Sequence, residues 1–268
     1  MSLKHFRPTT PSFRHKIRIN YVKDKIWRGP PIKSLIKGFT KANGRNDGLI
    51  SSYHRSRGTK KLYRAIDFER KTLDTSGIIE RIEYDPNRSS YVSLVIYTTG
   101  KMAYVLTTEG VNVGDTITSS RDSAAVIKLG NSLALKNIPI GTKVHNIELK
   151  PGEGGSLARA AGTFAKIIKQ KDSKITLRVR SKREIVVSEL SMATIGGSSK
   201  PDYKNIQGGS AGYSRYLGKR PKVRGVAMNP IDHPHGGGEG KTSGGRLSVT
   251  PWSIPTKGYK TKRKHIRK

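Results

Sequence analysis

The chain has 268 residues, and its 52 Lys and Arg against 19 Asp and Glu give a formal net charge of +33. Self-repulsion of this size opposes compaction unless a polyanion neutralises it. No run of 18 apolar residues is present, which argues against a membrane-spanning helix, and the cations are not confined to one face of an apolar helix. The absence of cysteine excludes disulfides, thiolate catalysis and cysteine-based metal sites. Nucleic acid is therefore the expected partner.

The charge is concentrated at the two ends of the chain. Residues 1–64 carry a net charge of +15, residues 65–200 carry +6, and residues 201–268 carry +12. A nearly balanced centre with basic arms is typical of a folded core that docks on a polyanion and threads its ends through it.

Short strands are predicted in the first half of the centre. Residues 78–84 and 91–97 are rich in β-branched and aromatic residues and are separated by the turn signal Asp85-Pro86-Asn87. Residues 102–106 alternate and follow Thr98-Thr99-Gly100, which predicts a hairpin. A further strand is expected over 110–117, with a break at Gly114-Asp115.

A second set of short strands follows. Apolar or alternating runs over 124–129, 144–149, 163–168, 175–179 and 185–187 predict these strands. Regular short strands with Gly, Pro and Asp breaks favour two small barrels over an α/β fold. We place the boundary between the barrels near residues 120–126.

The C-terminal segment has a different composition. Residues 201–268 contain 12 glycines and almost no periodicity, so a disordered, solvated tail is one interpretation. The alternative is an RNA-binding arm, because aromatic and Arg side chains between glycines suit stacking on bases and close approach to phosphates. The stretch 213–225 holds several cations, for which phosphate contact is the preferred interpretation.

Two candidate catalytic or ligand sites are rejected on their spacing. The run Gly236 to Thr242 resembles a phosphate-binding loop, but the pattern requires glycine where His235 stands, and no strand precedes it. Asp232, His233, His235 and Glu239 do not follow a known zinc spacing. Contacts of the histidines with RNA or backbone groups are the preferred interpretation, and no catalytic or metal-binding residue is predicted.

Long literal strings identify a family. In chain order these are FRPTTPSFR from Phe6, NGRN from Asn43, YRAIDF from Tyr63, EYDPNRS from Glu83, HNIELKPGEGG from His145, RAAGT from Arg159 and MNPIDHPHGGGEG from Met228. With these strings in this order, the chain resembles the universal large-subunit ribosomal protein two family over almost its whole length. A general RNA chaperone would share the basic arms but not the ordered strings.

The resemblance implies a mainly β fold, with an oligonucleotide-binding-fold barrel followed by an SH3-like barrel and long basic irregular extensions at both ends. The expected domains are 1–64 (N-terminal extension and start of the first barrel), 65–123 (first barrel), 124–200 (second barrel) and 201–268 (extension that penetrates ribosomal RNA). The implied role is structural rather than enzymatic: binding of large-subunit ribosomal RNA, subunit association, transfer-RNA binding and support of the peptidyl-transferase region, which the segment 232–240 would approach most closely.

The implied partners are ribosomal RNA and neighbouring ribosomal proteins, with transfer RNA nearby and neither a membrane nor a small-molecule substrate. No cofactor is expected beyond magnesium associated with the RNA. The predicted RNA-binding residues are Arg55, Arg57, Lys60, Lys61, Arg64, Arg88, Arg159, Arg215, Tyr216, Lys219, Arg220, Lys222, Arg224, Asn229, His233, His235, Gly236, Gly237, Gly238, Lys241, Arg246, Trp252, Lys257 and Lys260.

Two departures from the family pattern concern the proposed interface. The stretch 55–60 carries cations where the family has a glycine-rich run, and Tyr216 stands where the family has tryptophan. The acid-poor N-terminus raises the question of a mitochondrial presequence, but the resemblance begins near residue 3, so we expect a mature RNA-binding arm. The expected location is the mitochondrial ribosome, with a bacterial cytoplasm or a plastid as alternatives.

Overall fold

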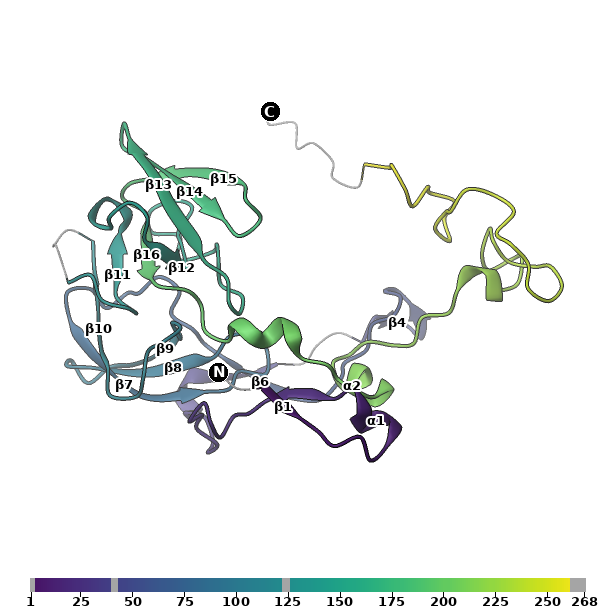
Figure 1. Cartoon of the computed structure of the whole chain (residues 1–268), viewed down its shortest axis with the longest axis horizontal. Coiled ribbons are helices and arrows are strands. Elements are labelled where there is room, and N and C mark those ends of the chain that lie inside the picture. The colour runs from purple at the N-terminus through teal and green to yellow at the C-terminus, as the bar shows by residue number, and fades with distance from the viewer. Residues whose placement is uncertain (1–2, 40–42, 122–125, 261–268) are drawn as a thin grey trace. The chain divides into compact units, whose positions relative to one another are not determined.

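The computed structural model describes residues 3–39, 43–121 and 126–260 (Figure 1). The chain is mainly β, as the sequence predicts, and it divides into two compact units. Residues 1–41 and 57–217 form unit 1, and residues 42–56 and 218–268 form unit 2. In the described part of the chain, no helix is both long and apolar enough to cross a membrane.

The first barrel of unit 1 has the oligonucleotide-binding type of fold and is built from four antiparallel strands. They are β7 (Ser76–Glu83), β8 (Val92–Tyr97), β9 (Met102–Leu106) and β10 (Thr116–Ser120), in the sheet order β10-β7-β8-β9. Val92 pairs with Leu106 across the hairpin, and Gly100 adopts a φ of +77° in its turn. The buried side chains of Ile79, Val95 and Ile117 form the centre of its core.

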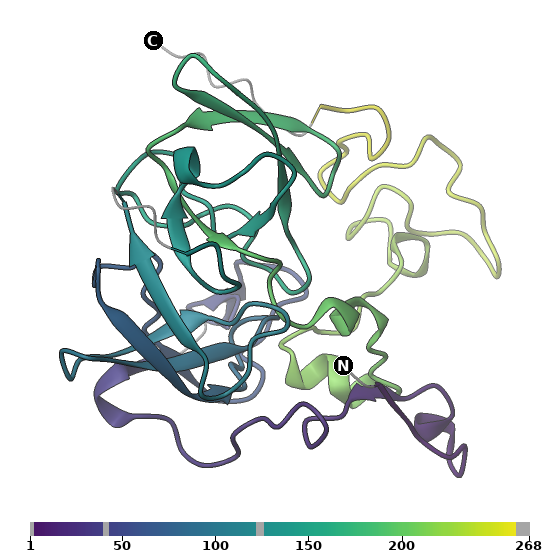
Figure 2. The same ribbon diagram turned by 60° about the vertical axis from the view of Figure 1, so that its left-hand side comes forward.

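The second barrel of unit 1 is SH3-like and lies beside the first (Figures 1 and 2). Its strands are β11 (Ser132–Ala134), β12 (Lys143–His145), β13 (Ala165–Lys171), β14 (Lys174–Val179), β15 (Glu184–Ser188) and β16 (Met192–Ile195), with the 3-10 helix η2 (Leu135–Asn137) after β11. Their order in the sheet is β15-β14-β13-β12-β16-β11. Leu133, Ile167 and Leu177 are almost fully buried in its core.

Hydrogen bonds join the two barrels into one ten-stranded sheet. Strands β10 and β11 pair in parallel through Ser119 with Ser132 and Ser120 with Leu133. A further bridge links Thr108, after β9, to Ser198, after β16. The barrels therefore share backbone pairing at two places, which fixes the loops near their junction.

Short elements from both ends of the chain complete unit 1. They are β1 (Leu3–His5), α1 (Pro11–Arg14), β2 (Ile17–Ile19), η1 (Lys33–Leu35), β3 (Ile36–Phe39), β6 (Lys61–Arg64), η3 (Pro201–Asn205) and α2 (Ala211–Tyr216). Strand β1 pairs with β2, and β3 pairs with β6. Ile26 is buried in the core of the first barrel, so part of the predicted N-terminal extension belongs to the folded body.

Unit 2 combines an early hairpin with the C-terminal segment. The hairpin consists of β4 (Arg45–Asn46) and β5 (Leu49–Ile50), and its turn residues Asp47 and Gly48 both have positive φ. The C-terminal segment contributes the 3-10 helix η4 (Gly225–Ala227) and a series of turns.

Several predicted strands need correction. The strand expected over 110–117 begins only at Thr116, because Gly114 and Asp115 form a turn in which the Asp115 carboxylate accepts the Asn112 N–H. Residues 126–129 form no strand, while residues 124 and 125 lie outside the described residues. The strand expected over 144–149 ends at His145, since Asn146 turns the backbone with a φ of +49°.

Candidate RNA interface

Arg88 is held in place by the turn that the sequence EYDPNRS forms after β7. The buried Asp85 carboxylate accepts the Asn87 N–H at 2.7 Å and pairs with the Arg88 guanidinium. A second guanidinium nitrogen of Arg88 donates to the Tyr63 hydroxyl at 2.9 Å. A cation fixed on both sides loses little side-chain entropy when it meets a ligand.

Arg159 reaches the same place from the second barrel. Its guanidinium carbon lies 4.6 Å from the centroid of the Phe68 ring, and that of Arg88 lies 5.5 Å from the same centroid. The loop that carries Arg159 is attached to the first barrel, because the Ala161 N–H donates to the Ser89 hydroxyl at 3.0 Å. We name Tyr63, Phe68, Arg88 and Arg159 the junction cluster. Two cations and two rings on one surface suit a phosphate backbone with an adjacent base.

Arg64, another predicted contact, lies mainly inside the protein. It ends β6, is 8 % exposed, and pairs through Nε with the Glu83 carboxylate at 3.1 Å. Glu83 also pairs with Arg81 at 3.0 Å and accepts the Tyr104 hydroxyl at 2.8 Å. The main interaction of Arg64 in the described structure is therefore structural.

A second group of predicted contacts lies at α2. Arg215 and Tyr216 are exposed there, and the Tyr216 carbonyl accepts the Thr59 N–H at 3.1 Å. This bond brings the exposed Lys60 close to them in the fold, although more than 150 residues separate them in sequence. Arg57 is also exposed, and Lys61 is half-buried on β6.

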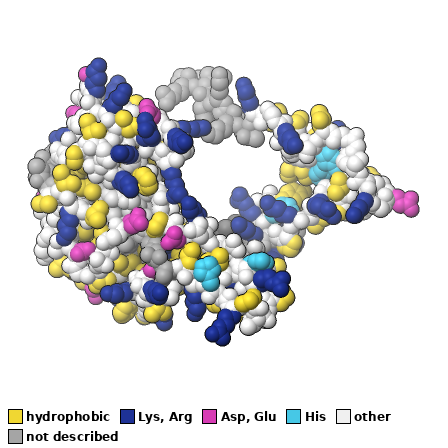
Figure 3. Space-filling view, in the orientation of Figure 1, with side chains coloured by type: hydrophobic (Ala, Val, Ile, Leu, Met, Phe, Trp, Pro, Cys, Tyr) yellow, Lys and Arg dark blue, Asp and Glu magenta, His cyan; other side chains and the backbone are white. Residues whose placement is uncertain are grey.

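Unit 2 brings together cations from both ends of the chain. Arg55 forms a backbone bridge with Lys219, and the Arg220 N–H donates to the His54 carbonyl at 3.1 Å. Tyr53 packs edge-on against Trp252, with 5.6 Å between the ring centroids. Further exposed members of the predicted set in this unit are Lys222, Arg224, Asn229, Lys241, Arg246, Lys257 and Lys260. Figure 3 shows Lys and Arg side chains on the surface of both units.

The two histidines of the segment 232–240 stabilise its turns. The Val249 N–H donates to His235 Nε2 at 2.9 Å, so Nε2 is the unprotonated nitrogen, and Nδ1 donates to the Gly244 carbonyl at 3.0 Å. His233 Nδ1 accepts the His235 N–H at 3.0 Å, and the two rings stack with centroids 5.1 Å apart. Both nitrogens of His235 are thus engaged in holding the loop.

The three consecutive glycines are required by close packing. A Cβ on Gly236 would collide with the Asn229 carbonyl, one on Gly237 would lie 2.8 Å from the Pro230 ring, and one on Gly238 would collide with Thr242. Gly237 and Gly238 also have φ near +90°, which strongly favours glycine. Among the described residues, no group of three or more His, Asp or Glu side chains is placed to hold a metal ion.

Two aromatic residues of unit 1 are absent from the predicted set of RNA contacts. Phe68, at the centre of the junction cluster, and Trp27, which lines a cavity of unit 1, were not predicted as contacts. Phe68 belongs to the recognisable string YRAIDF. This string marks the residue in the sequence but does not indicate which side chains it contacts in the fold. Trp27 lies in a stretch of the N-terminal arm that has no periodic pattern.

The comparisons with known proteins agree with this architecture. Residues 32–119 match the family model described as Ribosomal Proteins L2, RNA binding N-terminal domain, and residues 128–253 match Ribosomal Proteins L2, C-terminal domain. The chain is 53 % identical to the large ribosomal subunit protein uL2 of Rickettsia rickettsii (strain Sheila Smith), covering 98 % of this chain and 95 % of the relative. It is 52 % identical to the proteins of the same name from Rickettsia canadensis and Rickettsia prowazekii, with the same coverage.

These relatives are bacterial, which favours the bacterial type of chain. The matched RNA-binding domain implies ribosomal RNA and other ribosomal proteins as partners. Two family domains over most of the chain and 53 % identity over nearly its full length make it a structural, non-enzymatic protein of the large ribosomal subunit that belongs to the ribosomal protein L2 family.

Proposed function

We propose that this protein binds large-subunit ribosomal RNA through two surfaces, the junction cluster of unit 1 and the cations of unit 2. The observation that supports the first most directly is the convergence of Arg88 and Arg159 on the Phe68 ring. Each barrel supplies one arginine, so RNA bound there would contact both barrels at once. The exposed cations at α2 and in unit 2 would add phosphate contacts that fix the protein's position on the RNA.

Subunit association, transfer-RNA binding and support of the peptidyl-transferase region are the finer roles that we propose from the family resemblance. In this proposal the segment 232–240 approaches the peptidyl-transferase region and supports the RNA without taking part in the chemistry. The hydrogen bonds of His235 favour a structural role, because a ring with both nitrogens engaged has no free position for proton transfer. His233 Nε2 could donate to a phosphate or a 2′-hydroxyl group.

The metal ions that we propose near the protein are magnesium ions held by RNA phosphates. The predicted contacts of the protein are mainly guanidinium, ammonium and amide groups that donate hydrogen bonds. Magnesium prefers oxygen ligands, so we expect RNA phosphates and not these side chains to hold it.

The location in a mitochondrial ribosome stays a prediction, and the bacterial relatives favour the bacterial alternative. Mass spectrometry of large subunits purified from separated cell fractions would decide between the locations.

The proposed role of the segment is tested by assembling large subunits with His233→Ala or His235→Ala. We expect weaker or slower assembly, most clearly for His235→Ala, and near-normal peptide-bond formation in the subunits that assemble completely. His235→Asn serves as the conservative variant, because its amide can still donate to the Gly244 carbonyl. If fully assembled subunits lost peptide-bond formation by several orders of magnitude, and the remaining rate no longer depended on pH, a histidine would be acting as an acid–base group.

A further inference from the structure

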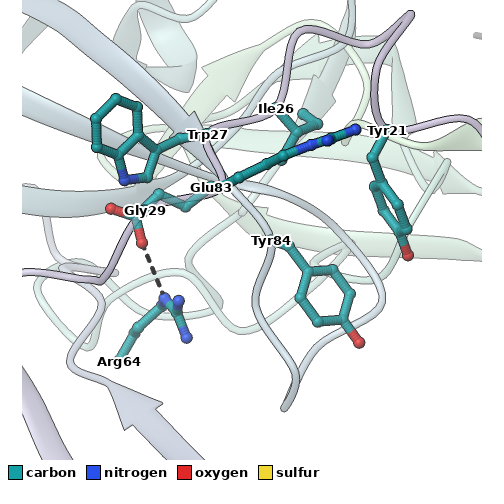
Figure 4. Close-up of a pocket in the computed structure, with 8 residues that line it drawn as sticks. Tyr21, Ile26, Trp27, Gly29, Arg64, Glu83 and Tyr84 are labelled. Atoms are coloured by element: carbon teal, nitrogen blue, oxygen red, sulfur yellow. Dashed lines mark hydrogen bonds and ion pairs between the residues drawn. The ribbon is translucent and has the colours of Figure 1, made fainter.

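A cavity of about 560 Å3 opens on unit 1, and its lining includes no residue of the junction cluster. Figure 4 shows its lining, with Trp27 on the left of the view above the Arg64–Glu83 pair, and Tyr21 and Tyr84 to the right of them. The backbone of Trp27 is attached to β7, since its N–H donates to the Ile82 carbonyl at 2.8 Å. The cavity therefore has a wall made by the N-terminal arm and a floor made by Arg64 of β6 and Glu83 of β7.

Three aromatic side chains of this cavity are unusually accessible. Trp27 is 46 % exposed, Tyr84 is 44 % exposed and Tyr21 is 37 % exposed. The Tyr21 and Tyr84 rings meet edge to face with centroids 5.6 Å apart, which fixes both orientations. The Arg81 guanidinium lies 4.7 Å from the centroid of the Trp27 ring and holds the indole in place. Rigid, accessible rings are the surfaces on which unstacked bases bind.

The lining of the cavity includes hydrogen-bond donors and one carboxylate. Arg64 uses its Nε for Glu83, and its two terminal nitrogens have no hydrogen-bond acceptor among the residues that the structure describes. Burial raises the pKa of Tyr21 to about 12 and raises that of Tyr84, so both phenols keep their protons at neutral pH and can donate. The Glu83 carboxylate is already bound by Arg64, Arg81 and Tyr104, and it disfavours a phosphate at the floor.

We propose that this cavity binds an unstacked base of single-stranded ribosomal RNA, which stacks on Trp27 or Tyr84 and accepts a hydrogen bond from Arg64. The exposed Arg28, which also lines the cavity, would meet the adjoining phosphate. A base fits the site better than a phosphate alone, because the lining combines three rings with a floor that holds a carboxylate. The inference rests on the RNA-binding role of the family, but not on the proposed roles of the junction cluster or of the segment 232–240.

The fluorescence of Trp27 gives a local measurement of occupancy. The chain has two tryptophans, so the full-length Trp252→Phe variant leaves Trp27 as the only indole. This variant is titrated with hexauridylate and with an abasic ribose-phosphate hexamer of the same charge. Binding of each labelled oligomer is measured in parallel by anisotropy. We expect saturable quenching by hexauridylate and at least tenfold weaker quenching by the abasic hexamer.

Two further variants test the geometry. Trp27→Ala is expected to weaken hexauridylate binding on the order of tenfold, in line with the loss of one base–aromatic stack. Gly29→Ala keeps every ring and charge but puts a Cβ 2.6 Å from the indole, so it should displace the ring and weaken the quenching. Thermal melting of each variant establishes that it remains folded.

The outcomes separate this inference from the protein's general RNA binding. If hexauridylate binds by anisotropy while Trp27 fluorescence does not change, RNA binding stands and the base-binding cavity is refuted. Equal quenching by the two hexamers would mean that the backbone and not the base is recognised, which also overturns the inference. No binding of either hexamer at low salt would contradict single-strand binding by the isolated protein, and with it the cavity.

Discussion

The Nζ of Lys200 lies 4.5 Å from the centroid of the Tyr91 ring, although Lys200 follows the last strand of the second barrel and Tyr91 precedes β8 of the first. The rings of Tyr84 and Tyr203 are each 5.2 Å from the same Nζ, and that of Tyr21 is 5.6 Å away. Lys200 is 1 % exposed. This cage connects the second barrel, the first barrel and the N-terminal arm through one buried cation.

The first prediction concerns the pH dependence that this cage produces. Burial lowers the pKa of Lys200 to about 8, although Asp24 opposes the shift. Between pH 8 and about 10 the unfolded chain holds a proton on this lysine that the folded chain has released, so this group's contribution to stability rises with pH. Lys200→Met should remove that rise, which denaturant unfolding from pH 7.5 to 9.5 would measure.

The matched control for Lys200→Met is Lys204→Met, which removes an exposed lysine from the neighbouring 3-10 helix. The window stops below pH 10 because ionisation of tyrosine enters above it, and the pKa of Tyr91 is raised by burial and by its hydrogen bond to Asp24. If the Lys200→Met and Lys204→Met chains showed the same slope of unfolding free energy against pH, the cage would not be the source of the dependence.

The second prediction concerns Glu83, which is 1 % exposed and neutralises two arginines. Glu83→Gln keeps the shape but leaves Arg64 and Arg81 without their carboxylate. Breaking a buried pair in this way costs about 3–5 kcal/mol. Denaturant unfolding of the full chain would measure the loss. Glu184→Gln is the control, since the exposed Arg178–Glu184 pair should contribute less than about 1 kcal/mol, and equal losses for the two variants would contradict the prediction.

The strands that the sequence predicts best are those with a clear sequence signal, although burial alternates along β14 and not along β9. β9 and β14 alternate clearly in sequence, and the structure has them at 102–106 and 174–179, within one residue of the predicted ranges. β11 and β16 were missed because every one of their residues is buried. A strand covered on both faces has no alternation, and these two are only three and four residues long.

The candidate interface was only partly predictable for a related reason. Literal strings and charge identified Arg88 and Arg159, but no local pattern indicates that both would meet Phe68, since that contact depends on how the barrels pair. The sequence likewise indicated Arg64 as an RNA contact, but it did not indicate that this side chain is buried against Glu83. Long-range pairing between segments decides such contacts, and single-sequence patterns carry little information about it.

The third prediction concerns RNA affinity at the junction cluster. Arg88→Ala and Arg159→Ala should each weaken binding to a large-subunit ribosomal RNA fragment, and the pair together should lose less than the sum, because both act on one site through Phe68. Removing one cation from a phosphate should reduce the slope of log K against log salt by about 0.7 to 0.9. Filter binding from 50 to 300 mM salt would measure both the RNA affinity and its dependence on salt. Lys166→Ala, an exposed cation on β13, is the control, and equal effects at Lys166 would indicate binding by overall charge alone.

The last prediction concerns acid stability and His145, which is fully buried at the end of β12. Burial lowers the pKa of His145 to about 4, and the nearby Arg70 contributes to the shift. Below pH 6.5 the unfolded chain binds a proton on this histidine that the folded chain does not bind until about pH 4. Stability from this group is therefore fully present above pH 6.5 and falls as the pH drops toward 4. At about 1.4 kcal/mol per pKa unit, the loss amounts to roughly 3 kcal/mol.

A substitution separates this histidine from the other acid-sensitive groups. His145 Nδ1 lies 3.1 Å from the Gly196 carbonyl, and the amide nitrogen of Asn in His145→Asn can donate to the same oxygen without titrating. We expect the variant to be less stable than the parent at pH 7, because the smaller side chain leaves a cavity. Its free energy of unfolding should then decline less between pH 6.5 and 4.5. His15→Asn removes an exposed histidine and should leave the decline unchanged. An undiminished decline in His145→Asn would show that carboxylates, and not this buried ring, set the acid limit of the fold.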